Sequence, residues 1–111
     1  MATVYYLNWD QPENEAQREF FHKAHLSETD LSSVNKEWYR KVTEVKGIER
    51  EKIWTAFQGG IPIDTDDEKM NQLRDTFNNT EDRSMSVGDI IELGGEPHIA
   101  ISMGFKKTKW E

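Results

Sequence analysis

The chain has 111 residues, enough for one domain with a modest core. It has no cysteine, which excludes disulfides and thiolate metal ligands, and no apolar run approaches the roughly 18 residues that a membrane-spanning helix needs. The net charge is −7, from 21 acidic and 14 basic residues, and residues 64–96 carry all of it, because they hold ten acidic and three basic side chains. Such a field repels nucleic acid and anionic membranes and attracts basic protein surfaces.

The first predicted elements are a strand and a helix. Val4-Tyr5-Tyr6-Leu7-Asn8-Trp9 is rich in β-branched and aromatic residues and predicts a strand over residues 4–9. Asp10-Gln11-Pro12-Glu13 then carries a cap residue and an early proline, which indicate the start of a helix. The helix is expected over residues 13–25, where Ala16, Phe20 and Ala24 recur every four positions.

Residues 31–46 fit two structures. Apolar residues recur there at helical spacing, and Gly47 is suited to end a helix; the apolar positions are Leu31, Val34, Trp38, Val42 and Val45. Residues 38–45 are also rich in β-branched and aromatic side chains, which favours a strand. We expect a helix over residues 31–46 and keep the strand as the alternative.

The next predicted element is a strand over residues 52–58. Ile53, Thr55 and Phe57 alternate with the side chains between them, and Gly59-Gly60 follows as a stop.

A helix is then predicted from Thr65-Asp66-Asp67-Glu68, which has the form of a capping box. Met70, Leu73 and Phe77 give this helix one apolar stripe, and Asn78-Asn79 is expected to end it.

The last third predicts a β-hairpin. Its strands are expected at residues 89–93 and 98–103, with Gly94-Gly95-Glu96 as the turn. Gly104-Phe105 closes the second strand, and residues 106–111 form a short basic tail.

These elements predict an α+β fold in a single domain over residues 1–111. We expect a small mixed sheet of about four strands, with the C-terminal β-hairpin, packed by two or three helices on one side. The side chains expected to be largely buried are Trp54, Phe57, Leu73, Phe77, Val87, Ile91 and Ile99.

The residue types that carry chemistry do not form a catalytic or metal-binding pattern. His22 and His25 share one side of the first helix, but zinc needs three or four convergent ligands, and His98 at a strand start is expected to be structural. The serines lack a nucleophile elbow, and Gly59-Gly60 lacks the lysine of a phosphate-binding loop. We therefore predict no catalytic residue, no metal, no cofactor and a protein that is not an enzyme.

The basic tail is a weak sign of nucleic-acid binding. Lys106, Lys107 and Lys109 lie beside Trp110, but three lysines give a small electrostatic contribution, which the acidic third opposes. Direct nucleic-acid binding is disfavoured, and so is membrane binding. The absence of a secretion signal and of cysteine predicts a cytoplasmic protein.

A distinctive string precedes the first hairpin strand: Arg83-Ser84-Met85-Ser86-Val87-Gly88-Asp89. Ser84, Ser86 and Asp89 are suited to bond nearby backbone groups, and Gly88 permits an unusual turn conformation. We predict a structural turn made by Ser84, Ser86, Gly88 and Asp89.

This string resembles the YodL-like family of small α+β proteins, which are found often on phages, plasmids and integrative elements. The family pattern is a helix ending in Phe-Asn, then Ser-Leu/Met-Ser-Val-Ser/Gly-Asp-Val-Val/Ile, a turn, and a strand ending in Gly-Phe. Phe77-Asn78, Ser84 to Ile91 and Gly104-Phe105 match it in order, and the resemblance covers roughly residues 52–106. It implies a mobile-element origin and a protein that binds a host target without a catalytic site.

The leading functional hypothesis is therefore a non-enzymatic binding protein of a phage or mobile element that modulates or inhibits a host protein through an acidic surface. The partner, of unknown identity, would present a basic or nucleic-acid-binding surface. The acidic residues expected to bind it are Asp64, Asp66, Asp67, Glu68, Asp82, Glu92 and Glu96.

Three other functional classes remain open. A small hydrolase or metal enzyme would need a pocket that gathers His22, His25 and carboxylates. A DNA-mimicking anti-restriction or anti-CRISPR inhibitor would use residues 64–96 to imitate phosphates. A PUA-like nucleic-acid-binding module would need a basic groove, which the charge distribution does not favour.

Overall fold

The computed structural model describes residues 1–8, 14–26, 31–46, 49–102 and 104–111. The predicted cap at residues 10–13 and the end of the first predicted strand, Trp9, lie outside the described residues.

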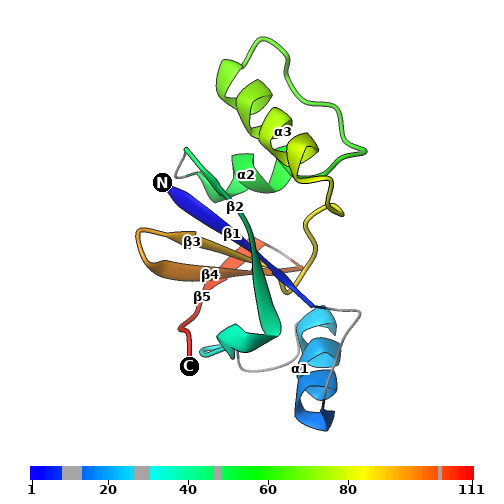
Figure 1. Cartoon of the computed structure of the whole chain (residues 1–111), viewed down its shortest axis with the longest axis vertical. Helices are drawn as coiled ribbons and strands as arrows, with labels where there is room; N and C mark the ends of the chain where they lie inside the picture. Colours follow the sequence, from blue (N-terminus) through cyan, green and yellow to red (C-terminus); the bar gives the residue numbers. More distant parts are fainter. Residues whose placement is uncertain (9–13, 27–30, 47–48, 103) are drawn as a thin grey trace.

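A five-stranded antiparallel sheet forms the centre of the molecule (Figure 1). Its strands are β1 (Ala2–Leu7), β2 (Tyr39–Val45), β3 (Ile90–Leu93), β4 (Glu96–Ile101) and β5 (Gly104–Lys107), arranged in the order β2-β1-β3-β4-β5. Every described neighbouring pair is antiparallel, so the prediction of a mixed sheet of about four strands was wrong in strand direction and one strand short. The predicted α+β class is confirmed.

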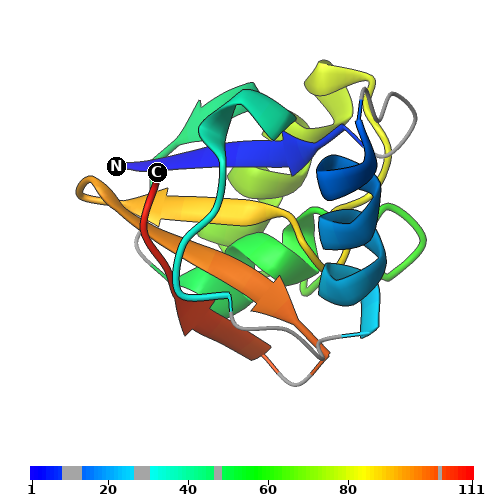
Figure 2. The same cartoon turned by 90° about the horizontal axis from the view of Figure 1, so that it is seen from below.

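The helices lie on both faces of this sheet. They are α1 (Glu15–Leu26), the short 3₁₀ helix η1 (Lys36–Trp38), α2 (Arg50–Ala56) and α3 (Glu68–Thr80). Figures 1 and 2 show α2 and α3 on one side and α1 on the other. The expectation that all helices pack on one side was therefore wrong.

The strand β1 supplies side chains to both faces, because successive residues of a strand point in opposite directions. Ala2, Val4 and Tyr6 belong to the core under α2 and α3, whereas Leu7 belongs to the core on the side of α1. All four are buried, which explains why this strand reads as a nearly continuous apolar run.

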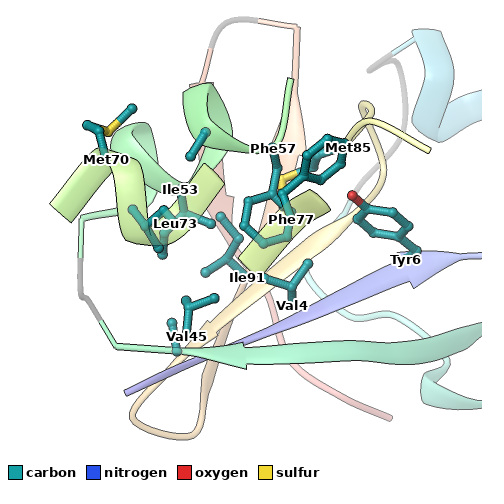
Figure 3. Close-up of a cluster of buried hydrophobic side chains, with 12 residues drawn as sticks. Val4, Tyr6, Val45, Ile53, Phe57, Met70, Leu73, Phe77, Met85 and Ile91 are labelled. Carbon is teal, nitrogen blue, oxygen red and sulfur yellow. The ribbon is translucent and has the colours of Figure 1, made fainter. Parts of the chain in front are cut away.

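The larger core lies between the sheet, α2 and α3 (Figure 3). Ile53 and Phe57 come from α2 and its C-cap, and Leu73 and Phe77 come from α3. The rings of Phe57 and Phe77 have centroids 5.3 Å apart. Each large apolar side chain buried in this way contributes roughly 1.5–3 kcal/mol, so this core is a main source of stability.

Five of the seven side chains predicted to be buried are so, namely Phe57, Leu73, Phe77, Ile91 and Ile99. Trp54 and Val87 are half-buried instead. None of the helices that the structure describes combines the length and apolar character that a bilayer crossing requires.

The strand predicted over residues 52–58 is wrong, because residues 50–56 form the helix α2. Ile53, Ala56 and Phe57 are fully buried, and their spacing of three and four is that of one helical face. The alternation seen in the sequence is incidental, since Thr55 is only half-buried.

The helix predicted over residues 31–46 is also wrong, and the alternative of a strand in its second half is correct. Residues 39–45 form β2 at one edge of the sheet. A bulge changes the register, since Val4 lies opposite Thr43 while Tyr5 lies opposite Lys41. One extra residue reverses the side-chain direction, so β2 does not show a regular alternation.

The start of α3 differs from the predicted capping box. The N-cap is Asp67, whose Oδ1 accepts from the amides of Lys69 at 3.0 Å and Met70 at 3.3 Å. The helix continues past the predicted stop to Thr80, and Glu81 then takes a left-handed conformation with a φ of 54°.

The predicted C-terminal hairpin is confirmed, with Gly94-Gly95 as its turn and a positive φ at both glycines. The basic tail is more ordered than predicted. Lys106 and Lys107 belong to β5, and Val34 pairs with the chain around Trp110 through hydrogen bonds of 2.8 and 2.9 Å. Residues 106–107 therefore belong to the sheet, and residues 109–111 pair with the chain around Val34.

Candidate functional site

A densely bonded polar group lies where β1 ends and β3 begins. Asp89 is 0% exposed. Its Oδ1 accepts from the amide of Leu7 at 2.8 Å, and its Oδ2 accepts from the amide of Ser86 at 2.7 Å. This carboxylate thus connects two segments that are 82 residues apart in the chain.

Arg83 is the charge partner of Asp89. Its Nη1 donates to Oδ2 at 2.7 Å and its Nη2 donates to Oδ1 at 2.9 Å, so the pair is bidentate. Nη2 also donates to the carbonyl oxygen of Leu7 at 3.1 Å. Charge-assisted bidentate bonds are among the strongest that side chains make, and they fix the orientation of both groups.

Two tyrosines complete this arrangement. The Tyr6 hydroxyl donates to the carbonyl of Arg83 at 2.9 Å, and the Tyr39 hydroxyl donates to the carbonyl of Gly88 at 2.7 Å. The Arg83 guanidinium lies 4.2 Å from the centroid of the Tyr6 ring, which is a cation–π distance. We call Tyr6, Tyr39, Arg83 and Asp89 the polar junction.

Burial sets the direction of the pKa shift for the carboxylate and both tyrosines of the polar junction. It raises the pKa of Asp89, whereas Arg83 and the two amides act in the opposite direction. Burial also raises the pKa of Tyr6 and of Tyr39, and the nearby Asp89 charge adds to both. Both tyrosines are therefore neutral donors at physiological pH.

The chemical capacity of Asp89 follows from these contacts. Its two oxygens accept four hydrogen bonds, and no part of the residue is exposed. A general acid or base must instead reach a substrate proton. The polar junction joins three segments of the fold, and its carboxylate is closed to a substrate.

The other residues of the predicted turn also bond the backbone. The Ser84 hydroxyl oxygen accepts from the amide of Gly59 at 3.0 Å. Gly88 has a φ of 97°, and its amide donates to the carbonyl of Ala100 at 2.9 Å. A residue with a Cβ rarely adopts this φ, so the glycine is needed for the turn.

The acidic residues predicted to bind a partner do not form one patch. Asp67 caps the start of α3, whereas Asp82 follows its end, and a 13-residue helix is about 20 Å long. Glu92 lies on β3, and Glu96 begins β4.

Four of these seven residues also have hydrogen-bond or ion-pair partners in the same chain. Asp67 accepts from Lys52 Nζ at 3.4 Å, and Asp82 forms a bidentate pair with Arg40. Trp110 Nε1 donates to Glu92 Oε2 at 2.6 Å. Glu96 pairs with Lys107, their nearest charged atoms being 3.3 Å apart.

The remaining predicted acids lie at the start of α3, and a further acid follows them. Asp64, Asp66 and Glu68 are exposed, and so is Asp75. Glu68 and Asp75 are seven residues apart on the side of α3 opposite Met70, Leu73 and Phe77. Glu68 and Asp75 form the acidic face of α3, and we include under this name Asp64 and Asp66, which precede the helix.

Asp75 was missing from the predicted set, although its helical spacing from Glu68 was visible in the sequence. Among the described residues, no lysine or arginine lies within ion-pair distance of these four carboxylates.

The two histidines whose side chains the structure describes, His22 and His98, lie on different elements. His22 is exposed on α1, and the side chain of His25 lies outside the described residues. His98 is buried on β4, and its Nδ1 lies 2.9 Å from Arg50 Nη1. Burial, followed by the Arg50 charge, lowers the pKa of His98. Because arginine only donates, Nδ1 is the acceptor and the ring is neutral.

Within the part of the chain that the structure describes, no three histidine or carboxylate side chains gather as they would around a metal ion.

Comparisons of this chain with protein-family profiles, curated proteins and solved structures found no match. The resemblance to the YodL-like family therefore rests on its motif residues alone.

Proposed function

We propose that this chain is a non-enzymatic binding protein that docks a basic surface of a partner protein on the acidic face of α3. The observation that carries the proposal is the difference between these four carboxylates and the other predicted acids. Asp64, Asp66, Glu68 and Asp75 are exposed and have no basic side chain of the described chain beside them, although Asp64 Oδ1 accepts from the amide of Asp66 at 3.0 Å. Asp67, Asp82, Glu92 and Glu96 instead accept from side chains elsewhere in the fold.

The position of α3 supports this proposal. Figure 1 shows this helix as the outermost layer on its side of the sheet, so a partner can approach without displacing another element. The inner side of α3 is fixed by the buried residues Met70, Leu73 and Phe77, so its outer side is presented on a rigid support.

Electrostatics predicts how such a partner would bind. Unpaired carboxylates in a chain of net charge −7 accelerate the encounter with a basic surface, and salt screens this effect. The rigid helix sets the register of the contact. A host protein with a nucleic-acid-binding surface has the required charge and would fit a modulator encoded by a phage or mobile element.

The proposal is tested by reversing the two acidic charges that α3 exposes, those of Glu68 and Asp75. The variant Glu68→Lys/Asp75→Lys and the wild type would each be used to isolate partners from host lysate, and the affinity for the purified partner would then be measured by calorimetry. We expect the variant to bind at least about tenfold more weakly, and wild-type binding to weaken with added salt. The fold should be retained, because both side chains are exposed.

A matched control is Glu15→Lys/Glu37→Lys, which reverses one acid in the first turn of α1 and another in η1. If both double variants lost the same affinity, the change in net charge alone would explain the loss. Binding that is unchanged by Glu68→Lys/Asp75→Lys, or that is insensitive to salt, would contradict the proposal.

A further inference from the structure

A pocket of about 290 Å³ lies between the end of β2, α2 and the first half of α3. Its wall is mostly apolar and comes from the aliphatic stems of its lysines and from Leu73, which is 6% exposed, while Ile53 beneath them is 0% exposed. Figure 3 shows Ile53 and Leu73 in the core cluster formed by α2, α3 and the sheet. This volume lies near the lower end of the usual range for small-molecule sites.

Three lysines and one acid, Glu49, line this pocket, so its lining is net basic, in contrast to the protein as a whole. Lys46 follows β2, Lys52 belongs to α2 and Lys69 belongs to α3. Three lysines thus converge on one opening of a chain with a net charge of −7. The aliphatic stems of lysines extend an apolar wall while their ammonium groups stay in water.

The three lysines differ in their partners. Lys52 Nζ lies 3.4 Å from an oxygen of Asp67 and 3.7 Å from an oxygen of Glu49, so its charge is compensated. Neither Lys46 nor Lys69 has a carboxylate within ion-pair distance among the described residues. Two ammonium groups at the rim are therefore available to an anion.

We propose that this pocket binds a small organic carboxylate with a compact apolar body. The carboxylate would lie between Lys46 and Lys69, and the apolar body would contact Leu73 and the aliphatic stems of the lysines. A purely inorganic anion would leave this apolar wall in water, whereas a neutral apolar molecule would leave both ammonium groups unpaired. Charge and shape together select the amphiphilic anion.

This site is separate from the acidic face of α3. Lys69 and Leu73 lie on other sides of the helix than Glu68 and Asp75, because successive residues are turned by about 100°. Binding of a carboxylate in the pocket can therefore be tested in variants that leave the proposed protein-binding residues unchanged.

The test uses three probes that share a phenyl group and differ in charge: anionic phenylacetate, neutral phenylacetamide and cationic phenethylamine. Binding would be followed by NMR through the methyl signals of Ile53 and Leu73. We expect phenylacetate to bind at least about tenfold more tightly than phenylacetamide, and phenethylamine to bind more weakly still.

The decisive variant is Lys46→Gln/Lys69→Gln, which should remove this preference for the anion. Lys106→Gln/Lys109→Gln is the matched control, because it removes the same charge from β5 and the chain after it. Amide spectra of both variants establish that the fold is retained. Equal binding of phenylacetate and phenylacetamide, no binding of either, or an equal loss in the control variant would overturn the proposal.

Discussion

The polar junction and the acidic face of α3 use carboxylates in opposite ways. Asp89 is 0% exposed and accepts four hydrogen bonds, two of them from Arg83. Glu68 and Asp75 are exposed, and no described basic side chain pairs with them. Removing a charge from water costs several kcal/mol unless partners replace the water, whereas an exposed charge costs little. The first carboxylate therefore belongs to the fold, and the others are available for binding.

The basic residues divide in the same way. Arg83 and Arg74 direct their guanidinium groups at the backbone and at Asp89, while Lys46 and Lys69 stand at the rim of a pocket. Arginine offers five donors in a planar group and is suited to hold fixed acceptors, whereas the lysine ammonium is a mobile point charge. Among these four basic residues, the two that bond fixed acceptors are arginines and the two that are available are lysines.

The largest expected effect is that of Arg83→Met. It would leave the Asp89 carboxylate buried without its charge partner, so we expect the free energy of unfolding to fall by about 3 kcal/mol in urea titrations at neutral pH. Arg40→Met is the control, since it breaks the exposed pair with Asp82 and should cost less than about 1 kcal/mol. If the two variants lost the same free energy of unfolding, the pair with the buried Asp89 carboxylate would be no more important to stability than the pair at Asp82.

The pH dependence of Arg83→Met sharpens this prediction. Burial holds the pKa of Asp89 above its ordinary value in the folded protein, and removing Arg83 takes away one opposing influence. As the pH falls, the folded state therefore takes up this proton before the unfolded state does, which stabilises the folded state. The stability deficit of Arg83→Met should shrink as the pH is lowered toward the ordinary pKa of an aspartate.

A smaller loss is expected for Arg74→Met. The Arg74 side chain donates to the carbonyls of Ala56 at 2.7 Å, Gln58 at 3.0 Å and Ile61, and so satisfies groups at the end of α2. Unpaired helix-terminal carbonyls are costly when they are shielded from water. We expect a loss of about 2 kcal/mol in urea titrations, and about half of it for Arg74→Lys. A loss as large for the lysine variant as for Met would contradict the role of the planar guanidinium.

The parts of the fold that were predictable from the sequence carry local signals. Gly94-Gly95 between two apolar runs predicted the hairpin of β3 and β4. Met70, Leu73 and Phe77 predicted α3, because one helical face packs on the core. The recurrence of Ala16 and Phe20 also predicted the helix α1, but Ala16 is exposed, and the described residues that α1 buries are Gln17 and Phe21.

The errors arose where tertiary structure overrides local pattern. In β2, the bulge places Tyr39 and Val45 in different cores, so the strand lacks a regular period. The helix α2 has seven residues, a length over which helical and strand periods are hard to separate. The strand β5 has four residues, of which Lys106 and Lys107 are exposed, so it gave no apolar signal.

The site was predictable only in part. Asp89 was identified as a turn residue, but its contact with Leu7 joins positions 82 residues apart, which no local pattern shows. Total charge predicted an acidic surface, yet it could not separate Asp82 and Glu92, which have partners in this chain, from Glu68 and Asp75. Pairing of this kind depends on the three-dimensional neighbours.

The most direct test of the division between structural and available carboxylates is a matched neutralisation. The free energies of unfolding of Asp89→Asn and Glu68→Gln/Asp75→Gln would be measured side by side in urea at neutral pH. We predict a loss of at least about 2 kcal/mol for Asp89→Asn and a change within about 0.5 kcal/mol for the double variant. Similar changes in the two variants, or a larger loss in Glu68→Gln/Asp75→Gln, would contradict the account.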